Sequence, residues 1–518
     1  MKALKVIING DSNLEATVFE RLEAQHLIEV CGFLVWSDKP SLSSTLFPKT
    51  KRFNQWQLIN LILSGDFKYF KVELISSDVE KAMGWAEPII MDMISRLDSA
   101  KSISHLERKN LYRYLMAFWL NFLEESKPDL FYSRATPHEV SDFILFCLCN
   151  IKNIRILTFN HTAMPGRRVL DSDYRHPWNC FKNFSYEYRD KNESLEILDS
   201  DIRKYILSIR GDYSAAMPID LKEVASYQTS IFSFKKIPLI LKEKIIFFFK
   251  SLLKKLFSIG CLLLAIFIRI FGLKSKSQNL ERFALRMIAS DLVQIEYSEL
   301  KKFYDDNTIS FDFTRPYIYF ALNFQPEMTT CPHGGVFNDQ VLAISLIARN
   351  LPEGWSLLVK EHPAQFFTNN VYGYIGRDKS FYKKILSLHN VFFVPRELDQ
   401  FFLIDHAKCV ATITGTAGWE ASVRGKVALI FGDAWYQYAP NVYRISDDQN
   451  FLSLLPLIRD GGFIDDSQLA HFMKTLFQKN GLIYFEEYEA RLSNKKFIFS
   501  ENAESLFQAI SEEISRIG

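Results

Sequence analysis

Four consecutive residues, Lys360, Glu361, His362 and Pro363, form the first group of side chains whose types suggest chemistry. They follow the apolar run 355–359, which is typical of a buried strand. In α/β proteins, ligands bind at the carboxyl ends of such strands. An imidazole there can donate to a phosphate oxygen, a lysine adds positive charge, and the proline fixes the turn. We therefore predict that Lys360, His362 and Pro363 belong to a phosphate-binding site.

A second group lies at a predicted strand-to-helix turn. Thr414, Gly415 and Thr416 form the turn, and a helix is expected to begin at Ala417. The first N–H groups of a helix are unpaired and attract an anion, and a glycine between two hydroxyls lets a phosphate approach the backbone. Glu420, one turn into the helix, would then reach a ribose hydroxyl. A plain helix cap, with Glu420 favoured by the helix dipole, is the structural alternative.

A third group follows the strand predicted at 317–323. Glu327, Gly334 and Gly335 lie in one loop with His333 and Asp339, at the same carboxyl edge of the predicted sheet. Loops in that position often carry function. The histidine or the aspartate could instead cap the helix that follows.

In the first half of the chain, two polar segments each follow an apolar strand, so they would face the second half across a cleft. A carboxylate or an imidazole among them could take the proton from an acceptor hydroxyl, whereas helix capping and surface ion pairing explain the same residues equally well. The first segment contains Glu139, Asp142 and His138, and we predict the catalytic residues among these three. The second segment contains His161, Arg167 and Arg168.

Acidic pairs can hold Mg²⁺ against a diphosphate, and the triplet Asp-Ser-Asp occurs at 171–173 and at 199–201. Neither triplet ends a convincing strand, so both are interpreted as solvated turns. No metal site is predicted.

These groups are positioned by elements that repeat as strand then helix, which indicates parallel sheets covered by helices. A chain of 518 residues is too long for one core. We expect a Rossmann-like domain at 1–170, a connecting region at 171–310, a second Rossmann-like domain at 311–464 and C-terminal helices at 465–518.

Within the connecting region, residues 235–276 carry ten lysines and arginines against one acidic residue, Glu243, interleaved with aromatic and aliphatic residues. This pattern favours a basic amphipathic segment on an anionic membrane surface, and a helix buried between domains is the alternative. The apolar run 256–268 is too short to cross a bilayer. A net charge of only +2 argues against a nucleic-acid partner.

The seven cysteines are scattered and form no CxxC pair, which argues against a disulfide framework or a zinc site and fits a reducing compartment. The first residues, MKALKVIINGDSN, are typical of a β-strand and a turn and not of a signal peptide. We therefore expect a cytoplasmic protein.

Residues 316–445 resemble the capsule polysaccharide biosynthesis proteins, a family that includes bacterial Kdo transferases. The resemblance is carried by three motifs in order: YFALNFQPEMTTCPHGGVFNDQ, LLVKEHP and ATITGTAGWEASVRGKVALIFGDAWY. It implies an α/β protein with the GT-B fold, in which two Rossmann-like domains face each other across a cleft. It also implies a nucleotide-sugar donor on the second domain and an acceptor on the first.

In related CMP-sugar transferases, a His-Pro motif and a hydroxyl-rich turn hold the CMP phosphate, and His362-Pro363 and Thr414-Gly415-Thr416 match these. The implied donor is CMP-Kdo or another CMP-linked acidic sugar. The implied acceptor is a lipid-linked saccharide, which places the enzyme peripherally on the inner leaflet. We expect no cofactor or metal, because the helix start, His362 and Lys360 can stabilise the leaving phosphate themselves.

Two alternatives stay open. Within the enzymes, a UDP-sugar transferase or a polyol-phosphate polymerase has a similar architecture. Outside them, the chain could be a non-catalytic membrane-associated assembly module that keeps the fold as a binding unit.

Overall fold

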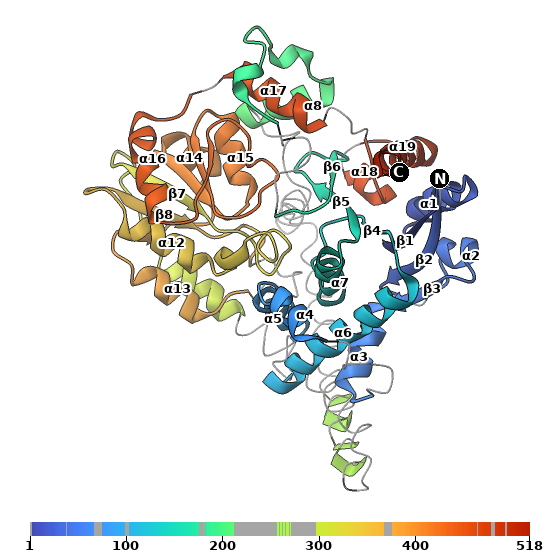
Figure 1. Cartoon of the computed structure of the whole chain (residues 1–518). Coiled ribbons are helices and arrows are strands. Elements are labelled where there is room, and N and C mark those ends of the chain that lie inside the picture. The colour runs from blue at the N-terminus through green and yellow to red at the C-terminus, as the bar shows by residue number, and fades with distance from the viewer. Residues whose placement is uncertain are drawn as a thin grey trace, which may run out of the picture.

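The computed structural model (Figure 1) describes residues 3–37, 39–66, 75–98, 103–175, 181, 183–211, parts of 256–270, 297–366, 376–463, 465–477, 482–492 and 495–517. Most of the basic segment predicted at 235–276 therefore lies outside the described residues.

The first sheet has six strands in the order β3-β2-β1-β4-β5-β6. Its strands are β1 (Leu4–Asn9), β2 (Ile28–Val35), β3 (Lys51–Asn54), β4 (Leu130–Ser133), β5 (Arg155–His161) and β6 (Arg168–Asp171). The first five run parallel, and β6 pairs antiparallel with β5. Its helices are α1 (Asn13–Ala24), α2 (Leu42–Leu46), α3 (Gln55–Leu63), α4 (Ser77–Met83), α5 (Glu87–Leu97), α6 (His105–Ser126) and α7 (Val140–Ile151).

The second sheet has the order β12-β11-β10-β7-β8-β9 and is parallel throughout. Its strands are β7 (Tyr317–Ala321), β8 (Ser356–Lys360), β9 (Val391–Phe393), β10 (Cys409–Thr412), β11 (Val427–Ile430) and β12 (Val442–Arg444). Its helices are η6 (Gly335–Asn338), α12 (Gln340–Arg349), α13 (Lys379–Leu386), α14 (Gln400–His406), α15 (Thr416–Val423) and α16 (Asp448–Asp460). The chain continues from β7 to β8 and β9 on one side and then crosses to β10 on the other side, so the order of the strands reverses between β7 and β10. Ligands bind at such a reversal point in open α/β sheets.

The central strands of each sheet are buried on both faces, which is why they are mostly apolar. On the first sheet, Ile7 packs with α3 to α7 on one face, and Val6 and Ile8 pack with α1 on the other. The second sheet divides in the same way between two apolar clusters. The predicted α/β architecture with two Rossmann-like domains is therefore confirmed.

The end of the chain returns to the first domain. Helix α19 (Phe499–Ile517) lies beside α1 (Figure 1), and Leu506, Phe507 and Ile510 complete the apolar layer over the first sheet. Arg21 on α1 pairs with Glu504 at 2.5 Å. Helix α19 is thus part of the first domain's core and not an appendage.

Part of the connecting region packs on the second domain instead. This part contains η3 (Tyr186–Tyr188), η4 (Leu195–Ile197) and α8 (Ser200–Arg210), and α8 lies beside α17 (Asp466–Phe477) in Figure 1. Tyr205 on α8 shares an apolar cluster with Trp419 and Phe472, and Arg210 pairs with Asp466 at 2.7 Å. The remaining helix, α18 (Glu487–Leu492), precedes α19.

No helix within the described parts of the chain is long and apolar enough to cross a membrane.

Candidate functional site

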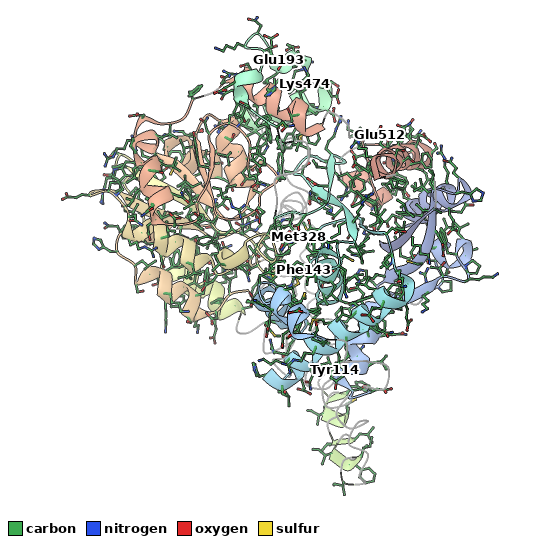
Figure 2. The ribbon with its side chains drawn as sticks, in the orientation of Figure 1. Tyr114, Phe143, Glu193, Met328, Lys474 and Glu512 are labelled. Carbon is green, nitrogen blue, oxygen red and sulfur yellow. The ribbon has the colours of Figure 1, made fainter. Side chains whose placement is uncertain are left out.

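A cavity of about 650 Å³ lies between the two domains, where the carboxyl edges of the two sheets meet. Figure 2 labels Met328, one of its lining residues, which lies in the middle of the view between the domains. The first domain contributes residues 160–168, and the second contributes residues between 319 and 329, then 360–363, 412, 414–417 and 433–435. Single lining residues are Tyr174, His333, Gln400, Tyr484 and Glu489.

The turn before α15 lies in the wall of this cavity. Gly415 is the N-cap of α15, and no side chain caps the helix through a hydrogen bond. A Cβ at Gly415 would lie 2.7 Å from the hydroxyl of Thr412, so the turn requires glycine for close packing. Thr414 and Thr416 also line the cavity. The hydroxyl of Thr414 donates to the carbonyl of Thr329, so the start of α15 offers backbone N–H groups and the hydroxyl of Thr416 to an anion.

Asn323, two residues after β7, joins the loop after β7 to the turn before α15. Its Oδ1 accepts from the hydroxyl of Thr412 at 2.8 Å and from the N–H of Ile413 at 3.1 Å, and its Nδ2 donates to the Thr414 hydroxyl at 3.3 Å. Its backbone N–H donates to Gln340 at 2.9 Å. Asn323 is only 4% exposed, and its buried side-chain amide holds the turn in place through these hydrogen bonds. Sequence reasoning missed it because it looked like the last residue of a strand.

The Lys-Glu-His-Pro motif separates into two functions. Lys360, His362 and Pro363 line the cavity, as does the buried Glu361. The carboxylate of Glu361 accepts from the guanidinium of Arg377 at 2.9 Å, with both side chains fully buried, and from the backbone N–H of His362 at 2.7 Å. Glu361 thus anchors the strand end and positions the imidazole.

Lys360 is buried, and its ammonium donates to the carbonyl of Leu398. Burial lowers the pKa of Lys360 to about 8, although Asp399 acts in the opposite direction. The cation at this wall is therefore sensitive to pH in the range where enzymes work.

The loop after β7 contributes unevenly. Glu327 lines the cavity and is exposed, and it accepts from the hydroxyl of Thr329 at 2.8 Å. Gly334 and Gly335 were expected to contact the ligand, but they do not line the cavity. A Cβ at Gly334 would meet the carbonyl of Thr330 at 2.5 Å, and Gly335 has a φ of +52°, so both glycines are required by the shape of the loop.

His333, between these residues in sequence, does line the cavity. Its ring lies 5.1 Å from that of Tyr174, which approaches from the chain that follows the first sheet. Burial lowers the pKa of His333 to about 3, so the imidazole is neutral at ordinary pH.

Glu420 is also placed differently from the prediction. It is 2% exposed and lies behind the wall, where its carboxylate accepts from the side-chain amide of Gln400, a lining residue. A residue one turn into a helix points back beside the preceding strand, and here that space is filled by α14. Glu420 therefore does not line the cavity, whereas Gln400 does.

Glu139, Asp142 and His138 do not line the cavity, and their predicted catalytic role is corrected. Asp142 accepts from the N–H of Glu139 at 2.9 Å and from Asn9 at 3.0 Å, which makes it part of the cap of α7. Burial raises the pKa of Asp142 to about 7. The imidazole of His138 is bound to the carbonyl of Thr136 at 2.8 Å. The capping alternative explains this segment.

The first-domain side of the cavity is formed by the loop between β5 and β6. His161, Arg167 and Arg168 line it, as the sequence indicated. Arg168 forms two hydrogen bonds, of 2.9 and 3.0 Å, with the carboxylate of Glu489 near the C-terminus. This contact holds the returning chain at the rim, and neither Glu489 nor Tyr484 was expected there.

The Asp-Ser-Asp triplets bind arginines. Asp199 pairs with Arg167 at 2.7 Å, and Asp173 pairs with Arg175 at 2.6 Å. Asp171 ends β6 and is buried, so the first triplet is not the solvated turn that was predicted. Among the residues that the structure describes, no three histidine, cysteine or acidic side chains gather as a metal site would require.

Comparison with solved structures finds weak, chain-wide likenesses. A UDP-GlcNAc 2-epimerase from Methanocaldococcus jannaschii covers 92% of this chain and 99% of its own, at 9% identity and a TM-score of 0.24. An S. aureus MnaA structure with UDP covers 96% and 99%, at 11% identity and a TM-score of 0.22. An E. coli structure described as trehalose-6-phosphate bound with UDP-2-fluoro glucose covers 98% of both chains, at 6% identity and a TM-score of 0.25.

The search of curated protein sequences gave no match. A family model does match, and it covers the stretch that holds the turn before α15, the Lys-Glu-His-Pro motif and the loop after β7. Residues 280–452 of this chain match the model of the capsule polysaccharide biosynthesis protein family.

Proposed function

We propose that the protein is a glycosyltransferase of surface polysaccharide biosynthesis, in capsule or lipopolysaccharide. It transfers an acidic sugar such as Kdo from a CMP-sugar to a lipid-linked saccharide. The observation that carries the proposal is the wall of the interdomain cavity, where the start of α15, His362 and Lys360 all face the same space.

Transfer breaks the bond between the anomeric carbon and the donor's phosphate oxygen, and CMP leaves with the bonding electrons. The developing negative charge is stabilised by the unpaired N–H groups at the start of α15, by the hydroxyl of Thr416 and by the ammonium of Lys360. These groups are fixed before the reaction, by Asn323 behind the turn and by Glu361 behind His362. We propose that these groups stabilise the negative charge without a metal, so that EDTA leaves the transfer rate unchanged.

The acceptor hydroxyl must lose a proton as its oxygen bonds to the sugar. With Glu139 and Asp142 outside the cavity, we propose Glu327 for this role. Of the lining carboxylates, Glu361 is buried and Asp433 and Glu489 are partly buried, whereas Glu327 is exposed, so its carboxylate is the most accessible to an acceptor hydroxyl.

The acceptor's lipid places the reaction at the inner leaflet of the membrane, so we propose a cytoplasmic enzyme bound peripherally there. The described parts of 256–270 support this with strongly exposed apolar side chains, among them Leu263 (63%) and Ile270 (75%). Ten cationic residues between 235 and 276 suit anionic headgroups.

Nucleotide release tests the donor. The purified protein is incubated with CMP-Kdo and, separately, with UDP-sugars, and free nucleotide is measured with and without a saccharide acceptor. We expect release from CMP-Kdo alone, and a loss of at least about 100-fold in Thr416→Val combined with His362→Ala. Release from UDP-sugars only would support the UDP-sugar alternative. Polymerisation of a CMP-linked polyol phosphate would support the polymerase.

A non-catalytic module is separated from both enzymes by binding. A ligand that binds the native state raises its stability, so CMP or UMP at 100 times its Kd should stabilise the protein by about 2.7 kcal/mol. If neither nucleotide shifts the unfolding temperature, the transferase proposal fails.

A further inference from the structure

Two tryptophans are exposed together at one edge of the first sheet. Trp36 follows β2 directly and is 39% exposed, and Trp56, in the first turn of α3, is 42% exposed. Their rings lie edge to face with centroids 6.1 Å apart. Tryptophan is usually highly buried, so two neighbouring indoles open to solvent favour a ligand-binding surface.

The strand order relates this pair to the cavity. Strands β1 to β5 are parallel, so Trp36 at the end of β2 lies at the same carboxyl edge as Asn160 and His161 at the end of β5. Between β2 and β5 there are three strand intervals, which is roughly 14 Å. The tryptophans thus lie at the same sheet edge as the acceptor side of the cavity but too far away to contact the reacting atoms.

Polar groups gather around the ends of the same strands. Arg52 on β3 pairs with Asp11, just after β1, at 2.9 Å, and their side chains are 23% and 21% exposed. The hydroxyl of Ser41 donates to Asp11 at 3.1 Å, and Ser43 also binds Asp11. These groups can exchange hydrogen bonds with a ligand at the surface.

We propose that Trp36 and Trp56 bind the saccharide chain of the acceptor, remote from the point of transfer. A sugar ring has an apolar C–H face that packs on an indole and a rim of hydroxyls that needs donors and acceptors, and this edge of the sheet offers both. A lipid chain would call for a broader apolar surface without the ionic pair. The inference rests on the proposed function for the identity of the ligand, and it extends the acceptor site from one sugar to an oligosaccharide.

The test measures saccharide binding without a donor. Oligosaccharides of graded length, released from the surface polysaccharide of the source organism, are titrated calorimetrically into the full-length protein. We expect affinity to rise with length, and Trp36→Ala/Trp56→Ala to weaken binding of the long chains by roughly tenfold while leaving the shortest unchanged. Phenylalanine at both positions should restore most of the loss.

Trp85 provides a matched control, because it is also 39% exposed but packs against the guanidinium of Arg175 at 3.9 Å and against Phe143. Trp85→Ala should leave the length dependence intact. Nucleotide-induced stabilisation, measured on the same samples, keeps the two proposals apart. If CMP binds but the long chains bind the double variant as tightly as the wild type, or do not bind the wild type, the tryptophan site is wrong. If the length dependence requires the tryptophans but no nucleotide binds, the donor assignment is wrong instead.

Discussion

At the scale of single residues, Glu361 shows that one motif can contain both a structural residue and residues that line the cavity. Sequence reasoning grouped it with Lys360 and His362 as a charged cluster at a strand end. In the structure its carboxylate binds Arg377 and the hydroxyl of Tyr382, at 2.9 and 2.5 Å, inside the second domain. The two neighbours that flank Glu361 line the cavity, and Glu361 holds them in place.

We predict that Glu361→Gln destabilises the protein by about 3–5 kcal/mol, because it leaves a fully buried guanidinium without its counterion. Urea unfolding followed by circular dichroism measures the change. Arg349→Gln is the control, since Arg349 and Asp448 form an ion pair in which both side chains are exposed, and its loss should matter far less. Equal effects of the two variants would contradict the structural role of Glu361.

A second prediction concerns the charge on Lys360. Its pKa of about 8 means that the ammonium loses its proton as the pH rises through that value, and nucleotide affinity should fall with it. Because this pKa lies below the ordinary 10.5, the unfolded chain binds more protons between the two values. The free protein should therefore gain stability as the pH rises from about 8 to 10.5.

Calorimetric titration of CMP from about pH 7 to about pH 9.5 tests this. Lys360→Met should weaken CMP by roughly tenfold or more and remove the pH dependence. Lys426 is a suitable control, because burial also lowers its pKa but it binds the carbonyl of Ala407, away from the cavity. If Lys426→Met changes CMP binding as much as Lys360→Met, the assignment fails.

At the scale of elements, α15 shows why a short turn can bind an anion. Tyr436 donates its hydroxyl to the carbonyl of Gly415 at 2.5 Å, which fixes the cap from outside. Gly418, one turn into the helix, leaves room for that ring, because a Cβ there would lie 2.4 Å from the tyrosine hydroxyl. Gly418 therefore allows Tyr436 to reach Gly415 and hold the turn in position.

We predict that Gly418→Ala costs about 1–3 kcal/mol through overpacking and weakens CMP binding, because the displaced tyrosine releases the carbonyl of Gly415. Tyr436→Phe removes the hydroxyl that clashes, so Gly418→Ala should cost less in that background. A double-mutant cycle in urea unfolding measures the coupling. Additive effects would show that the tyrosine does not transmit the change.

Much of the element order could be predicted from sequence, because buried parallel strands are continuous apolar runs separated by helical patterns. The helix expected after Asp339 is α12, and α15 begins one residue before the expected Ala417. The segment Glu139 to Asp142 could not be assigned from sequence. An acidic residue followed three positions later by another suits both a helix cap and an acid–base pair, and only burial distinguishes them.

At the scale of the whole molecule, the packing between elements far apart in the chain could not be predicted from the sequence. Amphipathic patterning predicted helices at 465–518, but it identifies an apolar face and not the partner of that face. Helix α17 packs on the second domain and α19 on the first. The chain between them passes the cavity, which explains how Tyr484 and Glu489 come to line a site formed by residues far earlier in the sequence.

The location of the basic amphipathic segment has its own consequence. In Figure 1 the described parts of 256–270 lie at one end of the molecule, below α3 and α6. Leu263 and Ile270 expose most of their side chains there, at 63% and 75%. An apolar surface of this kind, flanked in sequence by Lys255 and Arg269, suits the interface of an anionic bilayer.

We predict that the protein sediments with vesicles containing phosphatidylglycerol, less so at high salt because the lysines and arginines are screened. Leu263→Glu/Ile270→Glu should release it, since two carboxylates would have to enter the lipid interface. Leu342→Glu, on the exposed face of α12, adds a charge elsewhere at a position that is 44% exposed and should leave binding unchanged. Wild-type sedimentation by the double variant would mean that another surface holds the protein at the membrane. Donor hydrolysis should be equal in all three proteins, because none of these side chains lines the cavity.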